Sequence, residues 1–226
     1  MFLKVINILF LGSVIGSITS LSVQAFLYSI KFLTQAFDSS NLTFQSFSNI
    51  FSHPISFFFY IILVPILVGL IVGLIREYTE GKRWHGPPDV ILSVHQTKKP
   101  LDIKSGFLTS FSSILSISIG GSVGQYGPLV HFGATLGAEI KDLFSRSKGD
   151  YQIFLGAGVA AAISSGFGAP VAGLIFAREV ILRHQSLASF APILVSSLVA
   201  YYTTKTFFGF DPILPSAIGS INDMKE

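Results

Sequence analysis

Long runs of apolar residues, separated by short polar segments, fill almost the whole chain. The first run covers residues 2–37 and is interrupted only by Lys4 and Lys31, and the second covers residues 54–75. A helix needs about 20 apolar residues to cross about 30 Å of hydrocarbon. The pattern therefore predicts two long membrane-spanning helices at the start of the chain.

Shorter apolar runs follow, and breaks rich in glycine, proline or charge separate them. They predict further helices over residues 106–119, 128–140, 151–165, 171–182 and 187–204. The GxxxG spacing lets membrane helices approach closely. It occurs in the predicted helices at Gly12 and Gly16, Gly69 and Gly73, and Gly133 and Gly137.

Residues 84–96 differ from the other apolar segments because they are far too short to span a bilayer. Gly86, Pro87 and Pro88 form a turn, and the apolar residues after them end at His95. A short re-entrant helix fits this pattern. Such broken elements occur at membrane depth only where protein or a wet cavity satisfies their backbone, which is typical of a substrate pathway.

Composition agrees with a membrane location. The 226 residues are 50% hydrophobic and 12% charged, whereas soluble domains contain about 25% charged residues. We therefore expect an all-α integral membrane protein with a single transmembrane domain over residues 1–226. No segment remains for a soluble catalytic domain, so we do not expect an enzyme.

Charge predicts the orientation of the chain in the bilayer. Residues 38–53 contain no Lys or Arg, whereas residues 76–83 are basic. The positive-inside rule then places the N-terminus in the cytoplasm, with the first helix retained rather than cleaved as a signal peptide. The formal charge of +3 falls in short clusters between apolar runs, so nucleic acid is not an expected partner.

The glycine-rich stretch GGSVGQYGPLVHFGATLGAE, residues 120–139, predicts an anion site. Gly124 and Gly127 free the backbone, and Pro128 suits the first turn of a helix. Unpaired amides and the positive end of the helix dipole favour an anion at such a helix start.

Other binding motifs fit less well. The same stretch lacks the Lys-Ser/Thr of a phosphate loop. Gly156, Gly158 and Ala161 match a dinucleotide fingerprint, with Glu179 about 20 residues on, but no alternating strands surround them. The histidines have neither i, i+4 pairs nor clustered carboxylates, and the chain has no cysteine, so we expect no metal and no cofactor.

Two polar sites keep alternative interpretations. His85 directly precedes the re-entrant helix, where its ring can donate to an anion or serve in capping and packing. Arg178 and Glu179 lie in an apolar helix, which suggests function. Snorkelling and ordinary pairing near the Arg183 end of that helix are a strong alternative explanation.

Sequence elements in order resemble the CLC family of chloride channels and proton/chloride exchangers. HGPPDV at residues 85–90 resembles the family element GSGxP or GHGxP. GGSVGQYGPLVHFGATLG at 120–137 resembles GxxGREGPxVxxGxxxG, and GFGAPVAGLIFAREVILR at 166–183 resembles FNAPxAGxxFxxEV. One match is weak, but these matches in order are specific, and the resemblance covers residues 11–210.

The resemblance implies an all-helical CLC-like domain with re-entrant or broken helices, a homodimer with one anion path per subunit. It implies that helix N-termini from inverted-topology halves point at chloride or a similar small anion. His85 and Gly86 would then face a central anion site. The outer site would involve residues of the glycine-rich stretch: Gly124, Gln125, Tyr126, Gly127, Pro128, Leu129 and Val130.

Departures from the family pattern bear on mechanism. The gating glutamate of GREGP is Tyr126 here, and the arginine before it is Gln125. The inner proton glutamate of the exchangers corresponds to Val180, beside the retained Glu179. Tyrosine, with an ordinary pKa of about 10, is not a carboxylate gate near neutral pH. We therefore expect passive anion conduction without proton coupling.

Length leaves alternatives open. Family members carry a second half with a GxFxP element, which this sequence lacks, so it resembles the first inverted repeat of a voltage-gated chloride channel domain. The first hypothesis is a multi-pass chloride-channel-like protein of the plasma (inner) membrane. The alternatives are a non-transporting half-domain or truncated fragment and, third, a proton/chloride antiporter.

Overall fold

The computed structural model describes residues 2–37, 54–96, 100–122, 124–144, 151–183 and 187–209. Within these residues all the regular structure is helical. The elements are α1 (Phe2–Phe37), α3 (Pro54–Arg76), the short turn η1 (Glu80–Lys82), α4 (Pro87–His95), α5 (Ile103–Ser118), α6 (Tyr126–Phe144), α7 (Tyr151–Phe167), α8 (Pro170–Phe176), the π-helical segment η3 (Ala177–Leu182) and α9 (Leu187–Phe207).

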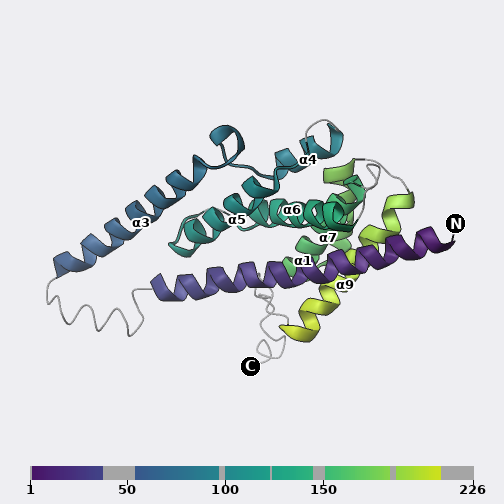
Figure 1. Ribbon diagram of the computed structural model, residues 1–226. Coiled ribbons are helices and arrows are strands. Elements are labelled where there is room, and N and C mark those ends of the chain that lie inside the picture. Colours follow the sequence, from purple (N-terminus) through teal and green to yellow (C-terminus); the bar gives the residue numbers. More distant parts are fainter. Residues whose placement is uncertain are drawn as a thin grey trace, which may run out of the picture.

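Helix α7 forms the centre of the bundle. It packs against α6 on one side and against α9 and α1 on the other, while α3 packs mainly against α5 and extends away from the bundle (Figure 1). Every side chain or glycine from Phe154 to Gly166 is buried. The small residues of this helix explain how neighbours pack around it, because small side chains let helix backbones approach.

Glycines mark the closest approaches between helices, as the sequence predicts for two of the GxxxG pairs. A Cβ added at Gly16 of α1 would lie 2.5 Å from the carbonyl oxygen of Ser196 in α9. One added at Gly133 of α6 would lie 2.6 Å from the carbonyl oxygen of Gly158 in α7. Only glycine fits such contacts without a shift of the backbone. In contrast, a Cβ at Gly73 of α3 meets no atom within 4 Å.

Buried hydroxyl groups join α1, α7 and α9. The Thr204 hydroxyl lies 2.9 Å from that of Ser20 and 2.8 Å from that of Ser165. The side-chain amide of Gln24 donates to the carbonyl oxygen of Ser165 at 3.0 Å. These mutual hydrogen bonds satisfy polar groups in an otherwise apolar interface.

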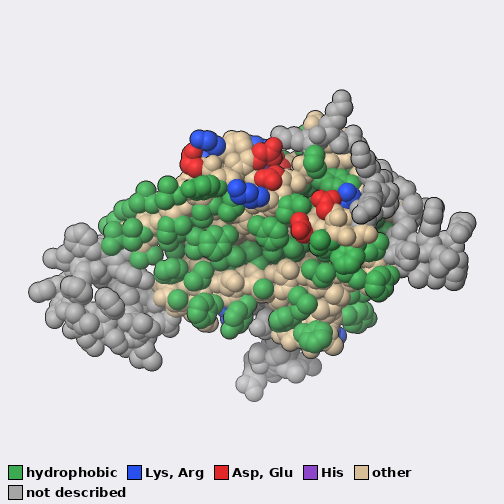
Figure 2. Space-filling model, in the orientation of Figure 1, with side chains coloured by type: hydrophobic (Ala, Val, Ile, Leu, Met, Phe, Trp, Pro, Cys, Tyr) green, Lys and Arg blue, Asp and Glu red, His purple; other side chains and the backbone are tan. Residues whose placement is uncertain are grey.

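The surface of the described chain is largely apolar. Figure 2 shows hydrophobic side chains over most of one face, with charged side chains gathered along an edge near the turn between α3 and α4. Exposed large side chains of α3 include Ile62, Leu63, Ile66, Leu67, Leu70, Ile71 and Leu74. An exposed apolar surface of this kind suits contact with lipid or protein rather than water.

Part of α1 is long and apolar enough to cross a membrane. Among the described residues, the stretch Leu9–Phe37 of α1 meets both conditions, and the apolar stretches Ile62–Arg76 and Tyr151–Phe167 are shorter.

Element bounds agree with the predicted ones except near the end of the chain. The sequence predicts one helix over residues 171–182, whereas α8 ends at Phe176 and continues as the π-helical η3. A π-helical segment requires i to i+5 hydrogen bonds, which apolar periodicity does not reveal. The predicted external loop 38–53 lies outside the described residues, as do His53 and His184.

Candidate functional site

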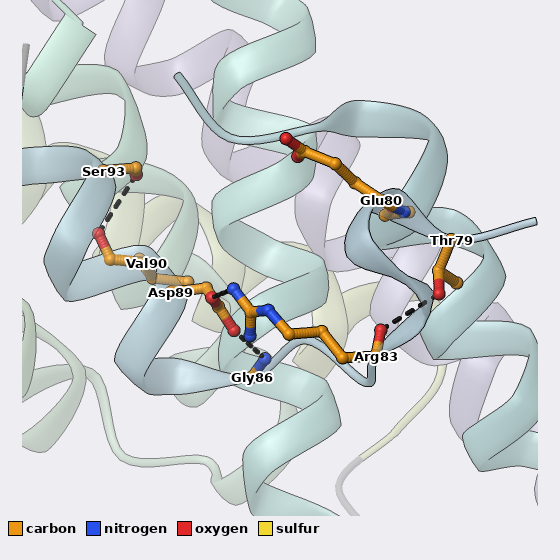
Figure 3. Close-up of polar contacts among 8 residues, drawn as sticks. Thr79, Glu80, Arg83, Gly86, Asp89, Val90 and Ser93 are labelled. Atoms are coloured by element: carbon orange, nitrogen blue, oxygen red, sulfur yellow. Dashed lines mark hydrogen bonds and ion pairs between the residues drawn. The ribbon is translucent and has the colours of Figure 1, made fainter. Parts of the chain in front are cut away.

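The start of α4 is capped by its own carboxylate. Gly86, the N-cap residue, donates its N–H to Oδ2 of Asp89 at 2.9 Å. The Asp89 carboxylate also pairs with the guanidinium of Arg83, which reaches across the turn before the helix (Figure 3). This hydrogen bond raises the pKa of Arg83 above its already high ordinary value.

This cap uses the backbone donors at the beginning of α4. Pro87 and Pro88 have no N–H group, the Gly86 N–H binds Asp89, and the Asp89 N–H donates to the carbonyl oxygen of Gly86 at 3.0 Å. The sequence predicts that Gly86 and the backbone after it face an anion. That role stays a prediction, and the structure gives the Gly86 amide another acceptor.

The first turn of α6 contains backbone donors that have no acceptor within the helix. Leu129 donates its N–H to the carbonyl oxygen of Gln125 at 3.1 Å, and Pro128 has no N–H group. The N–H groups of Tyr126 and Gly127, in the first turn, have no acceptor within the helix. Among the residues that the sequence places at the outer anion site, these two offer amides toward a ligand.

The starts of α4 and α6 lie side by side. A Cβ added at Gly127 would lie 3.8 Å from Cδ of Pro87. A Cβ at Gly124 meets no atom within 4 Å, so the backbone before α6 is open. The side chains of Leu129 and Val130 are fully buried in the core, and the role predicted for these two residues at the outer anion site stays a prediction. The structure thus brings the two predicted helix starts together, 41 residues apart in the sequence.

Aromatic side chains hold Tyr126 at the gate position that the sequence assigns to it. Its ring meets that of Phe176 edge-on, with centroids 5.4 Å apart, and that of Phe167 at 6.3 Å. The side chain remains 41% exposed. Beside it, Oε1 of Gln125 is buried without a hydrogen-bond partner. Tyr126 therefore lies where α6, α7 and α8 meet.

The residues predicted for the inner pathway lie on η3, which packs against α4 and α7. Glu179 and Val180 are exposed. The guanidinium carbon of Arg178 lies 5.0 Å from the centroid of the Phe190 ring, while its Nε is buried without a hydrogen bond. Arg178 therefore makes a cation–π contact with Phe190 rather than an ion pair with Glu179.

Sequence reasoning missed a histidine at this site. His131 is 1% exposed, and its ring stacks on that of His85 with centroids 6.1 Å apart. The signal was its position four residues after Gly127, which places both on one face of a helix. Within the described part of the chain, no group of three or more His, Cys, Asp or Glu side chains is arranged to hold a metal ion.

Comparisons with known proteins agree on one family. The family model described as "Voltage gated chloride channel" matches residues 64–224. The voltage-gated ClC-type chloride channel ClcB of Salmonella typhi is 27% identical over 91% of this chain and 49% of its own length. The ClcB of Escherichia coli is 27% identical over 69% of this chain and 37% of its own length.

Solved structures show the same fold. A slow cyanobacterial Cl⁻/H⁺ antiporter superposes with a TM-score of 0.73 at 20% identity, covering 92% of this chain and 48% of its own. A CLC-type fluoride/proton antiporter superposes with a TM-score of 0.66 at 21% identity, and the match covers 97% of this chain and 52% of the antiporter chain. The chain spans about half the length of the proteins it matches.

Proposed function

The chain belongs to the voltage gated chloride channel family, and from this premise we propose that it takes part in the passive movement of chloride or a similar small anion through a membrane. Its fold is the all-α CLC-like fold. The observation that carries the proposal is the meeting of two helix starts, where the first-turn amides of Tyr126 and Gly127 have no acceptor within α6. Free amides at a helix start stabilise an anion.

The absence of proton coupling is part of the proposal. Tyr126 and Val180 stand where the resemblance places the proton-handling carboxylates of exchangers. A hydroxyl in aromatic contact and an aliphatic side chain do not exchange protons near neutral pH. The antiporter activity of the structural neighbours is a property of those proteins, and a proton/chloride antiporter remains the least supported candidate for this chain.

A second candidate rests on the length of the match. The chain covers 49% or less of each of the channel relatives described above, and the second candidate is a non-transporting half-domain or truncated fragment. Such a chain binds an anion at the helix starts but does not conduct by itself. A homodimer in the plasma (inner) membrane, with a cytoplasmic N-terminus, belongs to the first proposal.

Chloride efflux from liposomes separates these candidates. The purified chain is reconstituted in liposomes loaded with potassium chloride, and efflux is followed after valinomycin dissipates the voltage. Passive conduction predicts efflux above that of protein-free liposomes. Efflux equal to that of protein-free liposomes contradicts conduction and supports the half-domain.

A further inference from the structure

A cavity of about 490 Å³ lies where α1, the end of α7 and the end of α9 meet the residue before α6. Helices α1 and α9 cross and pack against each other here (Figure 1). Cavities of roughly 300–1,000 Å³ hold organic ligands, whereas a single chloride ion fills only a small part of such a volume. The cavity therefore suits an organic molecule rather than a lone ion.

A lysine supplies the charge of this cavity. Among the described residues that line it, Lys31 of α1 is the one charged side chain, and none is a carboxylate. The acidic residues of the described chain lie at the α3–α4 turn, on α4, around the start of α5, at the end of α6 and on η3. The cavity therefore favours a ligand with a negative charge.

One polar side chain in the lining lacks a partner. Oε1 of Gln125 is buried without a hydrogen bond. The hydroxyl groups of Ser165 and Thr204, which also line the cavity, lie 2.8 Å apart, and the side-chain amide of Gln24 donates to the carbonyl oxygen of Ser165. A hydroxyl group on the ligand both donates and accepts, so it would satisfy Gln125 whichever way the amide is turned.

The apolar surface of α1 reaches the edge of this cavity. Leu21, Tyr28 and Phe32 are exposed on one side of α1, at spacings of seven and four residues. Tyr28 also lines the cavity, together with the apolar side chains of Leu27 and Phe208. Tyrosine is enriched where hydrocarbon meets the lipid headgroups. A ligand in the cavity can therefore extend hydrocarbon along the exposed side of α1.

We propose that this cavity binds an anionic phospholipid whose headgroup carries a free hydroxyl. The phosphate lies at Lys31, the hydroxyl bonds to Gln125, and the acyl chains lie on the exposed apolar side of α1. A free phosphate ester offers the same charge but leaves the apolar side of α1 without a partner, so the lipid is the better occupant. This site goes beyond the proposed function, because its ligand is held and not transported.

Thermal unfolding of the purified chain in detergent tests the site. A ligand that binds only the folded chain raises the midpoint of unfolding as its concentration rises. Phosphatidylglycerol should raise the midpoint. Phosphatidylcholine with the same acyl chains should not, because its headgroup carries no net charge and no hydroxyl. Equal increases with both lipids overturn the proposal, and so does an equal increase with glycerol phosphate alone, which would indicate a site for a free anion.

Lys31→Gln tests the charge without disturbing the core, since Lys31 is exposed. The apparent affinity for phosphatidylglycerol should fall about five-fold, the effect of one lysine near an anionic lipid. Lys205→Gln is the matched control, because Lys205 follows Thr204 but lies outside the cavity lining, with its ammonium 5.9 Å from the centroid of the Tyr201 ring. Its affinity should stay within about two-fold of the wild type. An unchanged affinity in Lys31→Gln overturns the proposal.

Gln125→Leu tests the hydroxyl contact. The wild-type chain should bind phosphatidylglycerol more tightly than phosphatidic acid, which has the phosphate without the glycerol headgroup. The variant should bind the two lipids equally, because leucine forms no hydrogen bond. A wild-type chain without this preference contradicts the role of Gln125. A failure of chloride efflux from liposomes bears on the proposed function and leaves these lipid measurements unaffected.

Discussion

At the scale of single residues, the proposed function places the gate of the anion path at position 126. Tyr126 begins α6, and its ring packs on Phe176 and Phe167. The resemblance to CLC exchangers places a glutamate here, whose carboxylate competes with chloride. A phenol held by aromatic neighbours carries no negative charge near neutral pH. In the proposed function, the first-turn amides of α6 therefore remain open to an anion.

Tyr126→Glu should introduce a carboxylate gate. Chloride binding should weaken by roughly ten-fold at about pH 7, because the ionised side chain competes for the amides at the helix start. Binding should recover below about pH 4.3, the ordinary pKa of glutamate.

Tyr126→Phe is the matched control for this substitution. It keeps the aromatic contacts and removes only the hydroxyl, so chloride binding should stay within about two-fold of the wild type. A pH profile of Tyr126→Glu that coincides with that of Tyr126→Phe would count against the assignment of position 126 as the gate.

Sequence reasoning found some site residues and missed others for physical reasons. Gly127 and Pro128 are visible because a helix start has a recognisable composition. The pairing of His131 with His85 is not visible, since it requires two histidines 46 residues apart in sequence (131 − 85) to meet in space. The capping role of Asp89 fits a known local pattern, a carboxylate three residues after the N-cap, and was available from the sequence.

At the scale of elements, glycine contacts determine which helices pack closely. Gly16 of α1 touches the backbone of α9, whereas Gly73 of α3 has open space around it. Both belong to GxxxG pairs, so the motif alone does not distinguish a packed glycine from an unpacked one. The difference lies in the partner helix.

Gly16→Ala should destabilise the chain, and Gly73→Ala should not. At Gly16 the new methyl group lies 2.5 Å from a backbone oxygen, and such overpacking costs about 1–3 kcal/mol. At Gly73 alanine meets nothing and gains helix propensity, up to about 1 kcal/mol. Thermal unfolding in detergent measures both, and equal midpoints for the two variants would show that the α1–α9 contact is not tight.

The positions of the helices could be predicted better than their exact first residues or the change from α-helix to π-helix. Apolar runs gave the positions of α1, α3, α4 and α7 to within a few residues. The start of α6 lies two residues before the predicted Pro128, because a first turn precedes the proline. The π-helical η3 and the left-handed Arg183 after it, with φ of 54°, arise from tertiary contacts that leave no periodic signal.

At the scale of the whole molecule, charge is separated from the apolar surface. The turn between α3 and α4 contains an exposed ion pair. Nζ of Lys82 lies 2.7 Å from Oε2 of Glu77. The hydrogen bond and charge of Lys82 hold the pKa of Glu77 below its ordinary value. A charged turn next to apolar helices fits the membrane–water boundary.

A cysteine at position 80 tests the predicted orientation. The chain contains no cysteine, so Glu80→Cys provides one reactive thiol on the exposed turn. A membrane-impermeant maleimide should label it only after cells are permeabilised, because the positive-inside rule places this turn in the cytoplasm. The wild-type chain is the unlabelled control, and labelling of intact cells would reverse the orientation.

The family and the helical architecture follow from the sequence, but the working assembly does not. Family motifs are local, whereas a dimer surface or a complementary half depends on residues that another chain contributes. The half-length match to the relatives and the exposed apolar face of α3 are both compatible with such a partner. Transport by the chain itself is therefore the quantity to measure.

Proton movement driven by a chloride gradient tests the central claim most directly. The chain is reconstituted in liposomes, a chloride gradient is imposed, and external pH is recorded together with chloride. We predict that chloride moves while external pH stays at the level of protein-free liposomes, because Tyr126 and Val180 replace the proton-carrying carboxylates. Proton uptake that follows the chloride gradient would contradict passive conduction.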